Sequence, residues 1–318
     1  MKEKKFPTEP FINGGFCRSR NAQKIPQINP ANEKVFAQVS AASESDLNAA
    51  VEGAQEAYVE VWRDMAPGKR TEILFKVSRL LRENIERIAQ VECRNIGKPI
   101  SDARDEAGLG ARVFEYYAGA ITKFFGQTIP VSRGGFDFTL RQPMGVVAAI
   151  VPWNFPFPIA CWKVAPALAA GNCVILKPAS QSPLTALLLG KIAHEAGLPP
   201  GVLQVLSGPG GKMGEALVNH PLIRKVSFTG STDVGSKIMA LAARDLKRVS
   251  LELGGKSPNV VFADADIEQA ASSSPMSVFG NTGQDCCARS RMFVERKVYD
   301  RFVELFLVAT KKIVVGDP

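Results

Sequence analysis

The sequence predicts an α/β protein whose centre is a parallel sheet with helices on both of its faces. Three observations carry this prediction. Five short runs of apolar or β-branched residues follow Met144, and helical segments separate them, a spacing that favours parallel strands. The chain has 318 residues, which is enough for two domains. It is 46% hydrophobic and 22% charged, a composition typical of globular proteins.

The segment before this sheet is expected to begin with strands and turns. In residues 1–40, the stretches INGGF and INPANEK supply the turn residues of short hairpins. From residue 43 the pattern becomes helical, because Ser43 and Asp46 have the spacing of a capping box. We therefore expect a helix that starts directly after Ser43.

Two longer helices and a hairpin are expected next. The segment 69–95 keeps its apolar residues at helical spacing and stops before Gly97, which predicts one long amphipathic helix. Another helix is expected over 103–125. The stretch TIPVSRGGFDFTLRQP at 128–143 alternates around a Gly-Gly pair and predicts a β-hairpin.

The runs that predict the sheet are, in order, GVVAAIV, CVILK, VLQVL, KVSFTG and RVSLEL. The helices between them are expected at 159–170, 183–196, 211–219 and 233–243. Ser182 and Pro183 predict the cap and the first turn of the second of these helices. Because ligands of parallel sheets bind beyond the carboxyl ends of the strands, functional residues are expected just after each run.

Polar residues or glycines do follow each run. Trp153 and Asn154 follow the first run, Lys177 ends the second, and SGPGGKMG follows the third. FTGSTDVG ends the fourth run, and Glu252 lies at the end of the fifth. A free amide is costly in an apolar stretch, so Asn154 would either cap a helix or stabilise a developing oxyanion. For Lys177, a solvated strand end is the alternative to a functional role.

Two of these stretches are candidate phosphate-binding loops. The third glycine of SGPGGKMG, Gly214, falls one residue late for the GxGxxG pattern, which favours an ordinary turn. In FTGSTDVG, Gly230 and Ser231 lie where a strand passes into a helix. Backbone N–H groups and the helix dipole at such a junction would hold a phosphate. A tight turn capped by Ser231 is the alternative.

The stretch GNTGQDCCARS at 280–290 places Cys286 and Cys287 side by side in a chain that has only two histidines. A thiol nucleophile needs a base or an environment that favours the thiolate. Glu252 follows an apolar run and precedes two glycines, so we expect its carboxylate to be partly desolvated and available as a general base. An ordinary strand-end glutamate is the alternative.

Composition argues against several other classes of protein. The charged first ten residues do not resemble a secretory signal. The apolar run 145–162 contains Asn154 and three prolines, which makes it a poor membrane span. Six scattered cysteines without CxxC spacing predict a reducing, cytoplasmic location and no metal site. The net charge of +8 comes from dispersed Lys and Arg, so we expect an anionic cofactor rather than nucleic acid.

Taken together, PWNFP, Lys177-Pro178, FTGST, LELGGKSP and GQDC resemble, in order and spacing, the motifs of the NAD(P)-dependent aldehyde dehydrogenases. The resemblance extends over essentially the whole chain, which within that family looks like the betaine-aldehyde and aminobutyraldehyde branch. It implies a Rossmann-like parallel-sheet cofactor domain at 1–123 and 144–254. It further implies the hairpin of an oligomerisation domain at 124–143 and the N-terminal part of an α/β catalytic domain at 255–318.

The resemblance also implies a role for each motif residue. Cys286 would be the nucleophile, Glu252 the general base and Asn154 the oxyanion amide. Lys177 would contact the ribose of the cofactor, which would be NAD, with NADP possible. The implied cofactor-binding residues are Pro152, Trp153, Asn154, Lys177, Ser180, Gly210, Gly214, Phe228, Thr229, Gly230, Ser231, Val234, Glu252, Leu253, Gly254 and Cys286.

The reaction that the resemblance implies begins when the Cys286 thiolate adds to an aldehyde carbonyl. The alkoxide, held by Asn154, passes hydride to the nicotinamide ring and leaves a thioester. Glu252 activates water, which releases the carboxylic acid.

The aldehyde substrate would lie among Phe155, Trp162 and Asp285. Aromatic faces and a carboxylate attract cations, so an amino- or betaine-type aldehyde is expected. The alternative for Asp285 is that it faces away from the substrate and caps a loop.

Two features depart from the family pattern. Ser180 occupies a position at which many NAD-preferring relatives carry a glutamate, so the site is expected to tolerate NADP as well as NAD. The chain stops at VGDP while relatives continue, so exposed sheet edges and an incomplete substrate tunnel are expected. Full-length relatives are homo-oligomers, dimers or tetramers, in which the hairpin pairs with a neighbouring subunit. The oligomeric state of this chain stays open.

Two alternative functions remain compatible with these residues. Cys286, Glu252 and Lys177 are also the residue types of a Cys-Glu-Lys amide or nitrile hydrolase. The second is a truncated, inactive homologue that acts only as a binding or structural protein.

Overall fold

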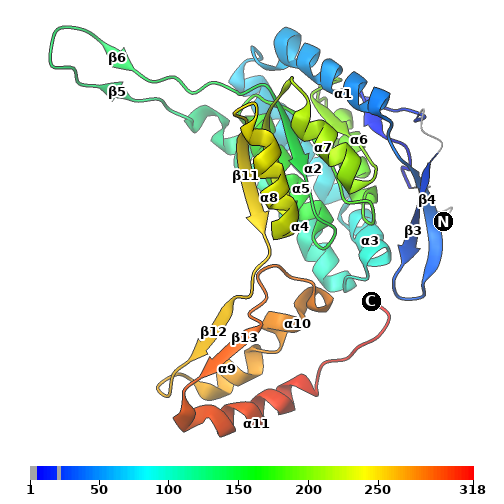
Figure 1. Cartoon of the computed structure of the whole chain (residues 1–318), viewed down its shortest axis with the longest axis vertical. Coiled ribbons are helices and arrows are strands. Elements are labelled where there is room, and N and C mark those ends of the chain that lie inside the picture. Colours follow the sequence, from blue (N-terminus) through cyan, green and yellow to red (C-terminus); the bar gives the residue numbers. More distant parts are fainter. Residues whose placement is uncertain (1–5, 20–22) are drawn as a thin grey trace.

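The computed structural model describes residues 6–19 and 23–318. The charged start at 1–5, and residues 20–22 of the segment predicted to form strands and turns, lie outside the described residues. Figure 1 shows a large body, residues 6–254, and a small unit, residues 255–318, below it. We use these two names throughout.

The first strands of the body form two antiparallel hairpins, as their turn residues predict. These strands are β1 (Phe11–Ile12), β2 (Gly15–Phe16), β3 (Lys24–Asn29) and β4 (Lys34–Ser40). Helix α1 (Glu44–Ala57) follows, and its predicted capping box is present: Ser43 and Asp46 each accept a hydrogen bond from the backbone N–H of the other. A π-helical turn, η1 (Tyr58–Trp62), continues α1.

The segment predicted as one long helix is two helices, so that prediction was wrong. Helix α2 (Pro67–Glu83) ends and α3 (Ile85–Ile96) begins at Asn84, whose side-chain amide donates to Leu80 O, 2.8 Å away. The local bond competes with the helix ladder, which apolar periodicity does not reveal. Gly97 ends α3 in the left-handed region, at φ 72°, as expected.

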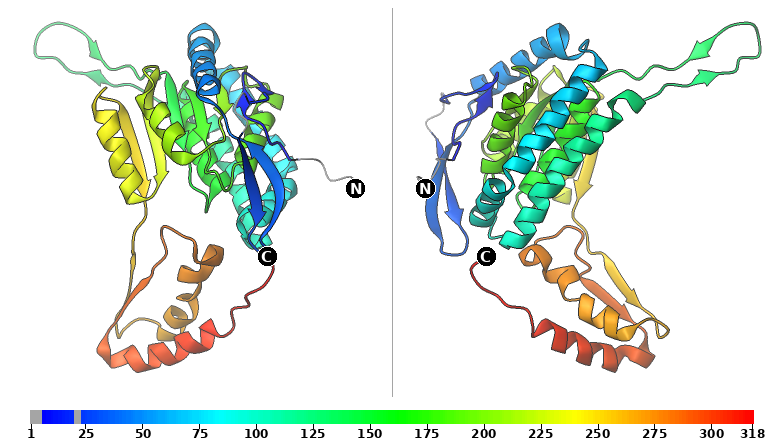
Figure 2. Two further views of the ribbon diagram at one scale, coloured as in Figure 1. Left: turned by 45° about the vertical axis from the view of Figure 1, so that its right-hand side comes forward. Right: turned by 180° about the vertical axis from the view of Figure 1, so that it is seen from behind.

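The next helix, α4 (Ile100–Ala120), starts three residues earlier than predicted and passes into a 3₁₀ turn, η2 (Ile121–Lys123). The hairpin follows as β5 (Thr128–Ile129) and β6 (Asp137–Phe138). It projects from the body in both views of Figure 2, and a long loop rather than a tight Gly-Gly turn joins its strands. Its exposed apolar side chains are Ile129, Val131, Phe136, Phe138 and Leu140.

The five predicted runs are the strands of one parallel sheet. They are β7 (Val146–Ile150), β8 (Cys173–Lys177), β9 (Leu203–Val205), β10 (Ile223–Gly230) and β11 (Arg248–Leu253). Their spatial order is β11-β10-β7-β8-β9, and the hairpin β1–β2 extends the sheet antiparallel beyond β9. The order reverses at β7, and the crevice beside such a reversal is where parallel sheets bind ligands.

Helices cover both faces of this sheet, as predicted. The crossover helices are α5 (Pro156–Ala169), α6 (Leu184–Glu195), α7 (Gly210–Asn219) and α8 (Thr232–Ala243). Helices α5 and α6 lie on one face, which α2, α3 and α4 cover further, and α1, α7 and α8 lie on the other (Figures 1 and 2). Strands β7 and β8 are therefore completely buried. We call these two faces the α5 face and the α8 face.

The predicted cap of α6 is absent. Helix α6 begins at Leu184 without a side-chain cap, and the buried Ser182 Oγ has no hydrogen-bond partner among the described residues. The dipeptide Ser182-Pro183 located the start of the helix correctly but not its hydrogen bonding.

The small unit pairs two parallel strands, and its first and last α-helices share a small apolar cluster with them. Its elements are β12 (Pro258–Val261), α9 (Ile267–Ser273), α10 (Met276–Gly283), β13 (Arg291–Val294), the 3₁₀ turn η3 (Arg296–Val298) and α11 (Tyr299–Thr310). Its buried apolar side chains among the described residues are Val261, Ala271 and Phe302. In residues 6–19 and 23–318, we find no helix whose length and apolar character would let it cross a membrane.

Candidate active site

A cavity of about 900 Å³ lies at the point where the strand order reverses. It is lined from the body by the segments that follow β7, β8, β9 and β10, and from the small unit by residues 283–286. We expected functional residues just after each strand. Residues that follow β7, β8, β9 and β10 line the cavity, and for β11 the lining residues are Leu253, at its end, and Gly254.

All the residues expected to bind the cofactor line this cavity, with the exception of Glu252. Four glycines border open space in the cavity. An ideal Cβ at Gly210, Gly211, Gly214 or Gly254 would meet no atom within 4 Å. At Gly230 an added Cβ would lie 2.4 Å from Phe228 Cζ, so a larger residue does not fit where β10 passes into α8.

Glu252 lies on the other face of the sheet. Side chains alternate along a strand, and Leu253 packs against α8, since it lies 2.7 Å from an ideal Cβ at Gly235. Glu252 therefore points to the α5 face. It is exposed, because β11 is the edge strand, so the prediction that its carboxylate is partly desolvated was wrong.

On this face, Glu252 lies near a half-buried lysine. Lys163 of α5 donates to Ser227 Oγ on β10, 2.9 Å away. Burial lowers the pKa of Lys163 to about 8, and the charge of Glu252 opposes that shift. The general base expected from the sequence thus has a neighbouring cation on the α5 face.

The segment that carries Cys286 has an unusual backbone. Helix α10 is interrupted near its end, where Asn281, Thr282 and Gly283 have φ values of 50°, 55° and 74°. The left-handed region is unfavourable for a β-branched residue such as Thr282, so its conformation is strained. Strain of this kind persists where surrounding contacts enforce it, and here the contacts come from two amides.

Asn154 and Asn281 join this loop to the body. Asn154 Nδ2 donates to Gln284 O, 2.8 Å away, and Asn281 Nδ2 donates to both Asn154 O, at 3.0 Å, and Gln284 O, at 3.1 Å. Asn281 is buried. The sequence analysis singled out Asn154 but missed Asn281, although an asparagine inside GNTG is a known signal for a left-handed turn.

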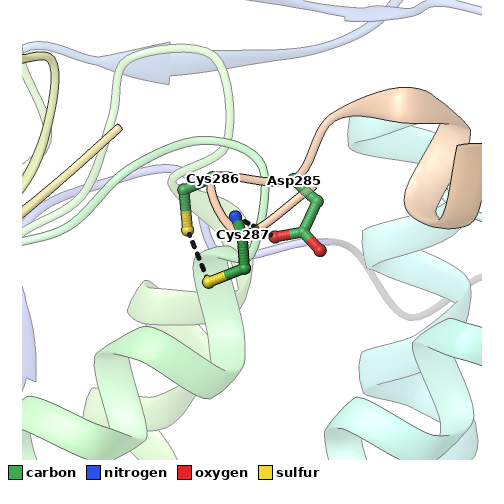
Figure 3. Close-up of side chains that lie close together, drawn as sticks. All are labelled: Asp285, Cys286 and Cys287. Carbon is green, nitrogen blue, oxygen red and sulfur yellow. Dashed lines mark hydrogen bonds between the residues drawn. The ribbon is translucent and has the colours of Figure 1, made fainter. Parts of the chain in front are cut away.

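Cys286 lies beside a second thiol and a carboxylate (Figure 3). Its Sγ is 3.8 Å from Cys287 Sγ, and Asp285 Oδ1 accepts from the N–H of Cys287 at 2.9 Å. Burial, then the hydrogen bond and charge of Cys287, then the charge of Asp285, raise the pKa of Cys286 to about 11. At neutral pH Cys286 is therefore a thiol, and a base would have to remove its proton before it could act as a nucleophile.

The side chains of Asp285, Cys286 and Cys287 place their potential ligand atoms within 4.8 Å of one another. This closeness follows from their being consecutive in the chain. One carboxylate oxygen of Asp285 already accepts a hydrogen bond from the Cys287 N–H. This bond agrees with the alternative prediction that Asp285 caps a loop.

Lys177 and Ser180 lie on the floor of the cavity. Lys177 is buried, Nζ donates to Pro178 O at 2.9 Å, and burial lowers its pKa to about 8. The alternative of a solvated strand end was wrong. Ser180 Oγ donates to Gly208 O, also 2.9 Å away, so its hydroxyl presents only lone pairs to a ligand.

The junction of β10 and α8 has the form of an anion site. Ser231 caps α8 by accepting from Val234 N at 3.4 Å, so the capped-turn alternative is present in fact. Lys237, one turn into the helix, also lines the cavity, although the sequence analysis did not select it. A turn capped by Ser231 and a phosphate-binding site are compatible interpretations of FTGST, because a capped helix N-terminus retains its dipole.

Two of the expected substrate residues, Phe155 and Trp162, do not line the cavity. Trp162 is 52% exposed on α5, and Phe155 lies under Lys98, whose Nζ is 4.2 Å from the ring centroid. Asp285 does line the cavity. Further lining residues were not selected from the sequence, although Pro209, Gly211, Gly283 and Gln284 lie within motifs that were noted: Ala179, Gln181, Pro209, Gly211, Glu215, Lys237, Gly283 and Gln284.

Comparisons with known proteins bear on the family of this chain. The family model "Aldehyde dehydrogenase family" matches residues 16–318. "Aldehyde dehydrogenase family 2 member B4, mitochondrial" of Arabidopsis thaliana is 45% identical over 314 residues, covering 98% of this chain and 58% of the relative. The first curated relatives extend further, so this chain spans 58–63% of their length.

Solved structures with the same fold include two named for different aldehydes. An indole-3-acetaldehyde dehydrogenase complexed with NAD+ superposes with a TM-score of 0.97, at 40% identity, and covers 100% of this chain and 65% of its own. A gamma-glutamyl-gamma-aminobutyraldehyde dehydrogenase from Burkholderia cenocepacia gives 0.95 at 39% identity, with 99% and 64% coverage. The fold, the parallel sheet and the family model agree, and the chain belongs to the aldehyde dehydrogenase family.

Proposed function

We propose that this protein oxidises an aldehyde to the carboxylic acid, with NAD+ or NADP+ as the electron acceptor. The observation that carries the proposal is the hydrogen bond from Asn154 Nδ2 to Gln284 O, 2.8 Å long. It joins the amide of PWNFP to the loop that bears Cys286, and both residues line the same cavity. An oxyanion donor and a nucleophile held together beside a nucleotide-sized space fit this reaction class.

The residues of the cavity fit a dinucleotide. Its volume of about 900 Å³ is near the upper end of the roughly 300–1,000 Å³ typical of small-molecule sites. The N-terminus of α8 and Lys237 would hold phosphate oxygens, and Lys177 and Ser180 would contact ribose hydroxyls. When bound, the oxidised nicotinamide supplies the hydride acceptor that conversion of an aldehyde to an acid requires.

Cys286 would form the covalent bond to substrate. The proton of its thiol passes to Glu252, which returns it to solvent before the acid is released; the sulfur bonds to the carbonyl carbon, and the carbonyl electron pair moves onto oxygen. Only one Asn154 amide hydrogen is engaged by Gln284 O, so the other is free to donate to that oxyanion. Such a donor typically contributes about 3–4 kcal/mol to the transition state.

Glu252 would act in the release of the acid. Water adds to the acyl carbon of the thioester, Glu252 takes its proton, and the Cys286 sulfur leaves as the C–S bond breaks. Because Glu252 does not line the cavity, this role requires its side chain to turn from the α5 face toward Cys286, whose backbone O lies 4.0 Å from an ideal Cβ at Gly255. The charges of Glu252 and Lys163 attract each other.

For the substrate, we propose an aldehyde that carries a cationic group, such as an amino or trimethylammonium aldehyde. Asp285 lines the cavity next to the nucleophile. Its charge adds to the effects of burial and of Asp102, which raise the pKa of Glu106, and the carboxylate of Glu106 forms an ion pair with Lys98. The relatives named above act on different aldehydes, so a direct comparison of substrates is needed.

The test is an assay of the purified chain with NAD+ and a panel of aldehydes, reading NADH formation and the acid product. Quenching of tryptophan fluorescence measures cofactor binding separately, because Trp153 lines the cavity. We expect 4-aminobutyraldehyde or betaine aldehyde to be preferred over hexanal, and Asp285→Asn to remove that preference. A chain that binds no NAD+ and forms no acid would contradict the proposal.

The geometry argues against the amide or nitrile hydrolase. In the sheet, Lys177 ends β8 and Glu252 lies in β11, with β7 and β10 between them. Three strand spacings of about 4.8 Å put the two backbones about 14 Å apart, and the side chains lie toward different surroundings. Cys286, Glu252 and Lys177 therefore cannot form one hydrogen-bonded triad.

A further inference from the structure

We propose that a buried pair of side-chain amides, Gln27 and Asn95, holds the loop 179–182 in the shape that nucleotide binding requires. Both are positioning residues, because neither lines the cavity. The identity of the ligand rests on the proposed function, whereas the effect of the pair on the loop does not.

The pair makes two hydrogen bonds to this loop and one hydrogen bond between its own side chains. Gln27 Nε2 donates to Ser180 O at 3.0 Å, and Asn95 Nδ2 donates to Gln181 O at 2.7 Å. A third bond, from Asn95 Nδ2 to Gln27 Oε1 at 3.1 Å, joins the two amides. Gln27 is 0% and Asn95 6% exposed, so water does not replace these partners.

The loop has little other support. It connects β8, which ends at Lys177, to α6, which begins at Leu184, so the carbonyls of Ser180 and Gln181 belong to neither element. Among the described residues, the hydrogen bonds to these two carbonyls come from the buried side chains of Gln27 and Asn95. The further bonds of the loop are Ser182 N to Ala179 O, 3.2 Å, and Ser180 Oγ to Gly208 O.

The anchoring residues come from elements that are remote in sequence. Gln27 lies in β3 and Asn95 near the end of α3, so a hairpin and a helix outside the central sheet fix a loop that lines the cavity. The left-handed Gly97 brings the two elements together, since an ideal Cβ there would lie 2.9 Å from Pro30. A ligand that touches Ser180 therefore depends on contacts more than 80 residues away in the chain.

The structure offers a matched control. Gln204, 0% exposed, is also a buried glutamine in an amide pair: its Nε2 donates to Asn13 Oδ1 at 2.7 Å and to Ala50 O at 3.1 Å. It does not line the cavity or contact loop 179–182. Gln27→Met and Gln204→Met remove the same amide group from comparable surroundings and should cost similar stability.

The first measurement needs no ligand: hydrogen–deuterium exchange of peptides that cover residues 178–184. We expect Gln27→Met and Asn95→Asp to increase exchange there about tenfold, because one to two buried hydrogen bonds are lost. Gln204→Met should leave exchange in these peptides unchanged. Equal exchange in the Gln27→Met and Gln204→Met variants would overturn the inference, whether or not the protein binds a nucleotide.

The second measurement is the Kd for 5′-AMP and for nicotinamide mononucleotide, read from tryptophan fluorescence. We expect Gln27→Met to weaken 5′-AMP about tenfold, equal to about 1.4 kcal/mol, and to leave nicotinamide mononucleotide unchanged. Unchanged 5′-AMP affinity despite a loosened loop would overturn the role in binding. If the unsubstituted chain binds neither nucleotide, the proposed function fails, and the exchange data alone decide the structural claim.

Discussion

The body and the small unit differ in how their chemistry is supported. In the body, one continuous core extends from Phe11 to Ala242 and surrounds the sheet that carries Asn154 and Lys177. The small unit, which carries Cys286, has a core of Val261, Ala271 and Phe302 among the described residues. Several of its large apolar side chains are exposed: Val260, Phe262, Phe279, Phe293, Leu307 and Val308.

This difference shows where the precision of the site comes from. The cavity is formed largely by the segments that follow the strands of one sheet, and its shape follows from strand order and glycine positions. Cys286 is placed instead by hydrogen bonds that Asn154 and Asn281 make across the boundary between the two parts. Binding should therefore be robust to changes in the small unit, whereas the chemical step should not.

The largest difference between catalysis and cofactor binding is expected for Cys286→Ala. Loss of a covalent nucleophile typically lowers kcat by on the order of 10⁴-fold or more, so oxidation of aldehydes should disappear. NAD+ binding, measured by tryptophan quenching, should be retained because the body supplies most of the cavity. Cys287→Ala is the matched control and should keep activity within about threefold. Equal losses in both variants would contradict the assignment of the nucleophile.

Two core substitutions compare the two parts directly. Phe302→Ala in the small unit and Phe114→Ala in the body each remove a buried aromatic ring, a change that costs about 3–5 kcal/mol. We expect Phe302→Ala to make residues 255–318 susceptible to protease while the main calorimetric transition stays in place. Phe114→Ala should lower that main transition. A single cooperative transition that moves equally in both variants would show that the parts are not independent.

Substitutions of Asn154 and Asn281 test the contact between the body and the small unit. Removal of an oxyanion donor lowers kcat by about 10²–10³-fold, and Asn154→Ala also removes one of the two side-chain hydrogen bonds to Gln284 O, leaving the one from Asn281. Asn281→Ala loosens the same loop without removing that donor, so a smaller loss of kcat is expected. Comparison of kcat and KM for both variants separates the two effects. A larger loss for Asn281→Ala would place the catalytic contribution in the loop rather than in the amide of Asn154.

The body was predictable from the sequence to a greater extent than the small unit. Apolar runs, capping residues and glycines are local signals, and they gave the strands, the helices and most of the cavity. The break at Asn84 was missed because a side-chain hydrogen bond interrupts a continuous apolar pattern. The exposed position of Glu252 was also missed, because the sequence of one strand does not reveal that it lies at the edge of the sheet.

The parts of the site that were not predicted depend on contacts between distant segments. Asn281 acts on a backbone carbonyl 127 residues away, and no spacing rule connects the two positions. The same holds for Gln27, which contacts the cavity loop from a separate hairpin. Motifs identify the residues that carry chemistry, whereas the residues that position them become visible only in three dimensions.

The protonation of Cys286 provides a test with a smaller and graded effect. Because its pKa is raised to about 11, the reactive thiolate is scarce at pH 7 and increases about tenfold for each pH unit up to that value. The rate of alkylation by iodoacetamide, followed on the peptide that contains Cys286, should rise accordingly and level off near pH 11. Asp285→Asn should move the plateau to lower pH. A plateau near pH 8 in the unsubstituted protein would contradict the described environment.

The smallest expected effect concerns the choice of cofactor and lies wholly in the body. Ser180→Glu places a carboxylate where the proposed ribose contact lies, so it should accept from the 2′-hydroxyl of NAD+ and repel the 2′-phosphate of NADP+. We expect the ratio of Kd for NADP+ to Kd for NAD+ to rise about tenfold, as measured by fluorescence titration. Ser180→Ala removes the hydroxyl without adding charge and should change the ratio less than about twofold. The alkylation rate of Cys286 should be the same in all three proteins, since residue 180 supports the nucleotide and not the thiol. A ratio that stays constant in Ser180→Glu would mean that the adenosine end of the cofactor lies elsewhere in the cavity, and the support that Gln27 and Asn95 give to this loop would then concern stability alone.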